Sequence, residues 1–160
     1  MLALLRPAEL SDLQTAAQIW HQGWWDAHSF LADKLGAART LTSFVERMAP
    51  RLEKTTVAEV DGRVVGMCVV VGDELEQLYV DRSARGKGVA RQLIEHAERL
   101  VAAAGFEKIW LAVATENHPA RRFYLKSGWT ETVEFEYQAE TANGHVPVAC
   151  YRCERQLRAS

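Results

Sequence analysis

The chain has 160 residues and a mass of 18.0 kDa, a length typical of one domain with one hydrophobic core. Its residues are 48% hydrophobic and 25% charged and its formal net charge is -2, which excludes a disordered or fibrous protein and gives no basic excess for nucleic acid. The longest nearly apolar run, residues 64–71, is too short to cross a bilayer. We therefore expect one globular domain over residues 1–160 that binds neither nucleic acid nor membranes.

The amino terminus and the cysteines indicate a cytoplasmic protein. Residues 1–7 lack the basic segment and the long apolar core of a secretory signal, and we interpret them as a first strand. Three cysteines, Cys68, Cys150 and Cys153, are an odd number, which favours a reduced compartment. The last two lie in an expected strand, where side chains three residues apart point to opposite faces. We therefore expect neither a CxxC site nor another metal site.

Two helices are expected before the first hairpin. Ser11 or Asp12 can cap the first helix, and Gly23 leaves its end undefined. Its apolar face comprises Leu13, Ala16, Ala17 and Trp20. The second helix is predicted from Ala37 to Met48, because its apolar residues recur at helical spacing and Pro50 closes it.

Aromatic and imidazole side chains cluster near the end of the first helix. Trp24, Trp25 and His28 would share a flank with His21 if the helix continued, and Asp26 lies among them. Trp24, Trp25, Asp26 and His28 are therefore candidates for a substrate pocket. In the alternative interpretation the tryptophans are hydrophobic anchors and the histidines are surface residues.

The remaining pattern alternates strands with helices. Expected strands cover residues 55–60, 63–71, 75–80, 108–115, 129–137 and 145–152. Asp61-Gly62 and Asn143-Gly144 favour tight hairpin turns. A long amphipathic helix begins near Val89 and ends at Gly105, and a short helix runs from residue 117 to Gly128. The pattern predicts a mixed, mainly antiparallel sheet flanked by helices.

A glycine-bearing loop, Arg85-Gly86-Lys87-Gly88-Val89-Ala90, joins the strand at 75–80 to the long helix. Its small residues let the backbone approach a phosphate, and the unpaired N–H groups of a first helical turn favour negative charge. Arg82 and Arg91 add cations around the turn. A dinucleotide fingerprint would need glycine at Arg91, and a phosphate loop would need Ser or Thr at Gly88. The loop therefore predicts another kind of phosphate site.

This loop resembles the acyl-CoA loop of the GNAT superfamily of N-acetyltransferases, whose signature Q/R-x-x-G-x-G/A is matched by Arg85, Gly88 and Ala90. The preceding LYV and the later segment ENHPARRFYLKSGW, Glu116 to Trp129, resemble two further signatures in the same order. The resemblance spans nearly the whole chain. It implies an α/β fold of the α+β type, with a mainly antiparallel sheet and one parallel βαβ crossover that carries the acyl-CoA loop.

The resemblance also implies that acetyl-CoA lies between the strands at 75–80 and 108–115. The residues that it assigns to the cofactor are Leu78, Tyr79, Val80, Arg85, Gly86, Lys87, Gly88, Val89, Ala90, Asn117, Ala120, Phe123 and Tyr124. Tyr124 matches the tyrosine of N-x-x-A-x-x-x-Y that protonates the departing thiolate in similar enzymes. A phenol of pKa about 10 can donate to a thiolate of pKa about 8.5.

The acceptor amine needs a base, because an amine of pKa about 10.4 is neutral in only about one molecule in a thousand near pH 7. We predict Glu76, which we place on the same strand face as Leu78 and Val80. A water relay is the alternative, and the other candidate bases are His118, His21, Asp26 and Glu74.

The predicted function is transfer of an acetyl group from acetyl-CoA to a primary amine of a small molecule or peptide, by direct attack in a ternary complex. Alternatives are a non-catalytic acyl-CoA-sensing module of the same fold, or a protein-interaction domain that uses Trp24 and Trp25. Acidic residues in the variable segments suit a cationic acceptor such as a polyamine, an aminoglycoside or lysine, and the chain does not choose among them. A homodimer that pairs the last strand is compatible with the pattern.

Overall fold

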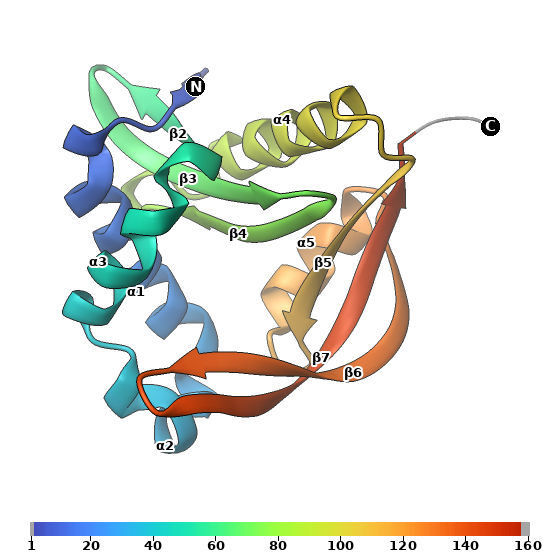
Figure 1. Ribbon diagram of the computed structural model, residues 1–160. Helices are drawn as coiled ribbons and strands as arrows, with labels where there is room; N and C mark the ends of the chain where they lie inside the picture. Colours follow the sequence, from blue (N-terminus) through green and yellow to red (C-terminus); the bar gives the residue numbers. More distant parts are fainter. Residues whose placement is uncertain (1, 158–160) are drawn as a thin grey trace.

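A seven-stranded mixed sheet runs through the computed structural model, which describes residues 2–157 (Figure 1). The strands are β1 (Leu4–Pro7), β2 (Thr55–Val60), β3 (Arg63–Val71), β4 (Glu74–Val80), β5 (Lys108–Ala114), β6 (Thr130–Thr141) and β7 (Gly144–Gln156). Their order is β1-β2-β3-β4-β5-β7-β6, and all neighbours are antiparallel except β4 and β5. The predicted mixed sheet with one parallel crossover is confirmed.

Helices cover both faces of this sheet. They are α1 (Leu13–His28), α2 (Ala32–Leu35), α3 (Leu41–Met48), α4 (Val89–Ala103) and α5 (His118–Lys126). Helix α4 crosses one face of β2–β4, whereas α1 and α3 pack on the other (Figure 1). None of the helices within residues 2–157 is long and apolar enough to span a membrane.

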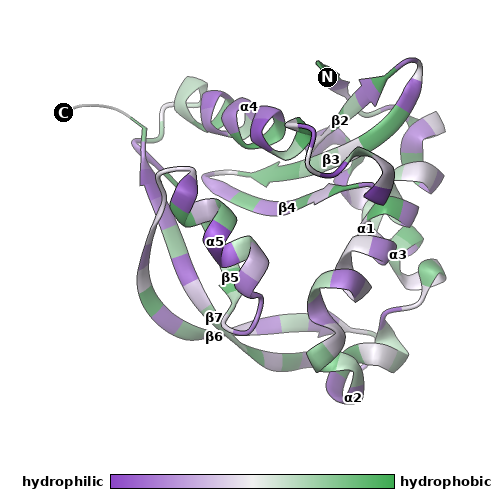
Figure 2. Ribbon diagram, turned by 180° about the vertical axis from the view of Figure 1, so that it is seen from behind, coloured by the Kyte–Doolittle hydropathy of each residue, from purple (hydrophilic) through white to green (hydrophobic). Residues whose placement is uncertain are grey.

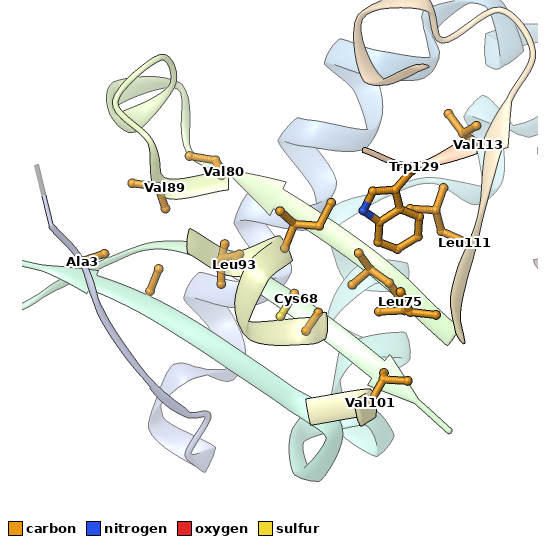
Figure 3. Close-up of a cluster of buried hydrophobic side chains, with 14 of the residues drawn as sticks. Ala3, Cys68, Leu75, Val80, Val89, Leu93, Val101, Leu111, Val113 and Trp129 are labelled. Atoms are coloured by element: carbon orange, nitrogen blue, oxygen red, sulfur yellow. The ribbon is translucent and has the colours of Figure 1, made fainter. Parts of the chain in front are cut away.

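Two hydrophobic clusters form the core, one on each face. Cys68 and Leu75 pack with α4 residues such as Leu93, and Figure 3 shows these side chains gathered near Trp129. Met67 lies on the opposite face and packs with α1 and α3. Figure 2 shows hydrophilic and hydrophobic residues interleaved along α4, as expected for a helix with one buried stripe. Alternation along β3 from Met67 onward therefore places Met67 and Val69 in one cluster and Cys68 and Val70 in the other.

Helix α1 continues through Gly23, where the sequence left its end undefined. Gly23 is buried against Tyr79 of β4, and a Cβ atom built at Gly23 would lie 2.3 Å from the Tyr79 Cδ1 atom. The glycine is needed there for close helix–strand packing, although glycine normally weakens a helix. This contact holds α1 against the site described below.

The second predicted helix starts later than expected. Residues 36–38 form a short 3₁₀ turn, and α3 begins only at Leu41. Thr40 is the N-cap, and its side-chain oxygen accepts the Ser43 N–H at 3.1 Å. The prediction of a start at Ala37 was wrong, because a capping threonine favours a helix start over a helix interior.

The hairpin turns lie where the sequence predicts them, and Cys150 and Cys153 point to opposite faces of the sheet as predicted. Asp61 and Gly62 both have positive φ, 52° and 77°, as the tight turn requires. The last hairpin is longer than predicted, since its pairing runs out to Thr141 opposite Gly144. Cys150 belongs to the α1-side cluster and Cys153 to the α4-side cluster, which confirms that the pair diverges.

Strands β4 and β5 separate soon after they meet. Their only register pair is Glu74 with Trp110, whereas β3 pairs with β4 along its length and β7 pairs with all of β5. Figure 1 shows the two strands diverging beyond that end. Each strand is held by its other neighbour, so the gap between them is stable without a ladder.

Replacing Gly23 with Ala tests the close packing of α1 on Tyr79. Helix propensity alone would stabilise the variant by about 1 kcal/mol. We expect a net loss of about 1–3 kcal/mol in the free energy of unfolding, because the new methyl group overlaps a buried ring. Urea unfolding measures the change, with Gln22→Ala at the preceding, exposed position as the control. A Gly23→Ala variant as stable as the parent would contradict the packing argument.

Candidate active site

A cavity of about 440 Å³ opens where β4 and β5 diverge, and we call it the gap cavity. Its walls come from α1, β4, β5, α5 and the loop at the start of α4. The predicted cofactor residues that border it are Leu78, Tyr79, Val80, Arg85, Ala90, Asn117, Ala120, Phe123 and Tyr124. The structure therefore brings together residues that are far apart in the sequence, as the resemblance implied.

The backbone of β4 presents polar groups to the gap cavity. The Asp81 N–H donates to the Val65 carbonyl on β3 at 2.7 Å. Because backbone groups alternate along a strand, those of Val80 and Leu78 point the other way, toward the gap. The Val80 carbonyl accepts Arg85 Nε at 2.9 Å. An extended ligand arm can therefore pair with this edge as an added strand would.

The glycine-bearing loop forms the start of α4 as predicted. Gly88 is the N-cap with φ of 88°, and Gly86 has φ of 74°, so both occupy the left-handed region that favours glycine. Gly86, Lys87 and Gly88 are exposed and do not border the gap cavity, while Val89 is buried in the core. The loop lies beside the cavity, with unpaired amides at the start of a 15-residue helix.

Asp26 ties α1 to this loop. Its carboxylate accepts Arg82 Nε and Arg85 Nη1, each at 2.9 Å. The hydrogen bond from Arg82, with that from Arg85, holds the pKa of Asp26 below its usual value. Asp26 borders the gap cavity, but a carboxylate engaged by two guanidiniums is a poor proton acceptor. Its contacts fit a role in positioning the two arginines.

Tyr124 and Asn117 place polar groups on the α5 side of the gap cavity. The Tyr124 ring packs against Phe123 and Trp129, with ring centroids 5.4 and 5.8 Å apart. Burial raises the pKa of Tyr124 above its ordinary value, so the phenol stays protonated. Asn117 caps α5, since its Oδ1 accepts the Ala120 N–H at 3.4 Å. The cap explains why asparagine precedes His118-Pro119.

A second cavity, of about 240 Å³, lies on the α1 side of the sheet, and we call it the aromatic cavity. Trp20, Trp24 and Tyr137 contribute aromatic walls. The residues that border both cavities are His28, Glu76, Gln77, Tyr79, Ala112 and Ala114. The two cavities therefore adjoin at the gap between β4 and β5.

Glu76 does not share the face of Leu78 and Val80, so that prediction was wrong. The register of β3 with β4 shifts between Val69 and Val70, leaving Glu76 as the extra residue of a β-bulge. Its Oε1 accepts Arg51 Nε at 2.6 Å on the α1 side of the sheet. A bulge depends on the partner strand, so simple alternation placed Glu76 incorrectly. Glu76 nevertheless borders both cavities.

Glu74 is the most perturbed acid in the aromatic cavity. Burial, together with the nearby charges of Glu76 and Asp73, raises its pKa to about 7. The sequence placed Glu74 only among the alternative bases. The acidic cluster at residues 73–76 was the available signal, but its burial was not visible in the sequence.

Of the aromatic and imidazole side chains predicted to form a substrate pocket on α1, Trp24 and His28 border the aromatic cavity and Trp25 does not. Trp24 and His28 stack with ring centroids 5.4 Å apart and border the aromatic cavity. Trp25 borders neither cavity, and its indole N–H donates to the Arg39 carbonyl at 2.9 Å. Burial lowers the pKa of His28 to about 4, and its Nδ1 lies 3.1 Å from the Trp24 carbonyl. His28 is therefore neutral, with Nδ1 as the donor.

Sequence reasoning missed the cations of the aromatic cavity, Arg39, Arg47 and Arg51. Arg47 and Arg51 are four residues apart, a spacing that can place two side chains on one flank, but nothing local indicated a cavity. His21 and His118, two of the alternative bases, border neither cavity. Within residues 2–157 no group of three or more His, Cys, Asp or Glu side chains could hold a metal ion.

The sequence and the fold match a known class of transferase. The family model described as Acetyltransferase (GNAT) family matches residues 14–129, and the chain belongs to this family. It is an N-acetyltransferase of the GNAT type by sequence as well as by fold.

Named relatives agree with this assignment. An uncharacterized N-acetyltransferase of Mycobacterium tuberculosis is 32% identical over 127 residues, which cover 75% of this chain and 79% of the relative. The peptidyl-lysine N-acetyltransferase YjaB of Salmonella typhimurium is 26% identical, with 82% of this chain and 86% of the relative covered. The structure of yncA of Salmonella typhimurium with its cofactor acetyl-CoA superposes with a TM-score of 0.72 at 17% identity, covering 100% of this chain and 96% of that one.

Proposed function

We propose that the protein transfers the acetyl group of acetyl-CoA to a primary amine of a small molecule or peptide, by direct attack in a ternary complex. The observation that carries the proposal is the junction of the gap cavity with the aromatic cavity between β4 and β5. A thioester in one cavity and an amine in the other would meet there. The acetyl-CoA bound to yncA supports the choice of cofactor.

The gap cavity would hold the cofactor mainly through backbone. The pantetheine arm can pair with the backbone groups of Leu78 and Val80 that face the gap. The N–H of Val80 is then a donor for the acetyl carbonyl oxygen. The pyrophosphate would lie at the loop 85–90, where α4 begins and its amides favour negative charge. Arg85 is already at the cavity wall.

Two carboxylates would serve the amine. Glu76 borders both cavities, so we place it next to the attacking nitrogen as base. Glu74, whose pKa lies about 7, can take the proton onward because it is partly ionised near neutral pH.

Tyr124 would donate to the departing sulfur. Its raised pKa keeps the hydroxyl proton in place until negative charge develops on a thiolate of pKa about 8.5. Its position in the wall of the gap cavity is compatible with this role.

Calorimetric titration with acetyl-CoA, followed by free-thiol release with a panel of primary amines, tests the function directly. Saturable binding and amine-dependent thiol release are the expected results. No binding of acetyl-CoA would contradict the proposal.

Replacing Gly88 with Val should weaken acetyl-CoA binding by about tenfold or more. A β-branched residue held at φ of 88° costs about 1–3 kcal/mol, and the loop would change its conformation to relieve that strain. The matched control is Gly62→Val, which places the same strain at φ of 77° in the β2–β3 turn, away from both cavities. Calorimetry on both variants, with thermal unfolding alongside, separates binding from stability. Equal weakening in both would show that the loop has no special role.

Removing the Tyr124 hydroxyl should slow chemistry and leave binding intact. We expect Tyr124→Phe to lower kcat by about 10²-fold, the usual contribution of one acid group, with the acetyl-CoA Kd unchanged. Single-turnover thiol release measures the chemical step. Tyr151→Phe is the control, since Tyr151 borders neither cavity. Full single-turnover activity in Tyr124→Phe would remove Tyr124 from the mechanism.

The pH profile of kcat/KM should break at an apparent pKa of about 7, because Glu74 must be ionised to accept a proton. Glu76→Gln should lower kcat/KM and move the break to lower pH, since it removes a negative charge that raises the pKa of Glu74. Glu74→Gln should abolish the break. A break that stays near pH 7 in Glu74→Gln would exclude Glu74 as its source.

A further inference from the structure

Three guanidinium groups crowd the aromatic cavity. Arg47 stacks over Trp20 with its Cζ 4.5 Å from the ring centroid, and Arg51 lies over the same ring at 5.5 Å. Arg39 lies over Trp24 at 5.6 Å. All three arginines border the cavity. The aromatic faces offset part of the cost of burying these cations.

Two of the arginines lack partners for buried N–H groups. Nε and Nη1 of Arg47 and Nε of Arg39 are buried without a hydrogen-bond partner in the part of the chain that the structure describes. Arg39 is only 3% exposed, and its one hydrogen bond from the guanidinium goes to the Glu140 carbonyl at 2.7 Å. Arg47 Nε lies 3.4 Å from a Glu140 carboxylate oxygen, and that carboxylate is 55% exposed. Buried donors of this kind call for an acceptor.

Charge repulsion among the three arginines also indicates that an anion binds in the aromatic cavity. Burial, followed by the neighbouring charges of Arg39 and Arg51, lowers the pKa of Arg47 to about 10. Arg51 is neutralised by Glu76, but Arg39 and Arg47 have only the exposed Glu140 nearby. An anion bound between them would relieve the repulsion and supply the missing acceptors.

The acidic groups belong to a different element. Glu74 and Glu76 enter the cavity from β4, whereas Arg39 and Arg47 enter from α3 and the turn before it. The cavity thus presents carboxylates on β4, with Glu76 at the junction, and cations with unsatisfied N–H groups on α3 and the turn before it. Its volume of about 240 Å³ is small for a ligand site, for which about 300–1,000 Å³ is usual.

We infer that the acceptor is a small amine that also carries a carboxylate, an amino-acid-type zwitterion whose carboxylate binds Arg39 and Arg47. Its amine then faces Glu76 at the junction. This inference rests on the proposed function, because it names the substrate class of that site. A polyamine would place a second ammonium beside Arg39 and Arg47, where repulsion disfavours it.

The chemical step balances without another reactant. The ammonium gives one proton to the carboxylate pair, and the neutral nitrogen attacks the acetyl carbon. The N–C bond forms as the C–S bond breaks. The second proton from nitrogen compensates for the proton that Tyr124 gives to the CoA sulfur, so the products are the N-acetylated amino acid, free CoA thiol and one released proton.

The test compares amines that differ only in the carboxylate: L-methionine with 3-(methylthio)propylamine, L-glutamine with 4-aminobutanamide, and L-lysine with cadaverine. Thiol release at saturating acetyl-CoA gives kcat/KM for each. We expect at least one pair in which the amino acid is preferred by about tenfold or more, the usual effect of charged hydrogen bonds. Equal or better turnover of the anion-free member in every pair would overturn the inference, as would a preference for Nα-acetyl-lysine amide over all free amino acids.

Variants connect that preference to the arginines. Arg47→Met and Arg39→Met should bring the ratio within the preferred pair close to one, whereas Arg47→Lys should keep part of it. The ratio is measured on one preparation, so partial unfolding does not change it. Arg99→Gln, an exposed position of α4 outside both cavities, should leave it unchanged. A preference that survives both Met variants would overturn the assignment.

Binding data separate the two levels of the proposal. Failure of acetyl-CoA to bind would overturn the proposed function. Binding and turnover with anion-free amines alone would overturn only the acceptor class. If acetyl-CoA binds but no amine releases thiol, the binding of the same pairs is measured by calorimetry on CoA-saturated protein. Preferential binding of an amino acid supports the inference if Arg47→Met abolishes that preference. Equal binding of both members in every pair overturns it.

Discussion

The divergence of β4 from β5 is the constraint on which the rest of the site depends. These parallel strands share one register pair, Glu74 with Trp110, and then separate. Open backbone edges inside a sheet are costly unless something pairs with them. Here each strand keeps a full ladder on its other side, with β3 and β7 respectively, and a cluster of core residues packs on each face. The sheet is therefore stable while its centre stays open to ligands from both faces.

The opening also explains why the two cavities differ in chemistry. The gap cavity is bordered by α1, α5 and the backbone of β4 and β5, so it suits an extended arm held mainly by main-chain groups. The aromatic cavity is closed by α1, α3 and β6, which supply indole rings and charged side chains. Partial burial there strengthens every charge interaction, which is why the pKa of Glu74 rises to about 7 and that of His28 falls to about 4.

Close packing at α1 keeps these charges in place. Gly23 lets the helix approach Tyr79, which borders both cavities, and Asp26 ties the same helix to Arg82 and Arg85 of the loop. The sequence left the end of the helix undefined at Gly23, because glycine is unfavourable within a helix when no partner is visible. It also placed Glu76 on the wrong face, because the β-bulge is set by pairing with β3 rather than by residues next to Glu76.

The sequence by itself determined the features that depend on near neighbours: the hairpin at Asp61-Gly62, the amphipathic helix that starts at Val89, and the motif around Tyr124. Backbone φ preferences and helical periodicity act over a few residues, so they can be read along the chain. Only the tertiary structure decided the convergence of Arg39 and Arg47 with Glu74 in one cavity. Burial and the charge of distant neighbours fix that environment, and neither is encoded at a single position.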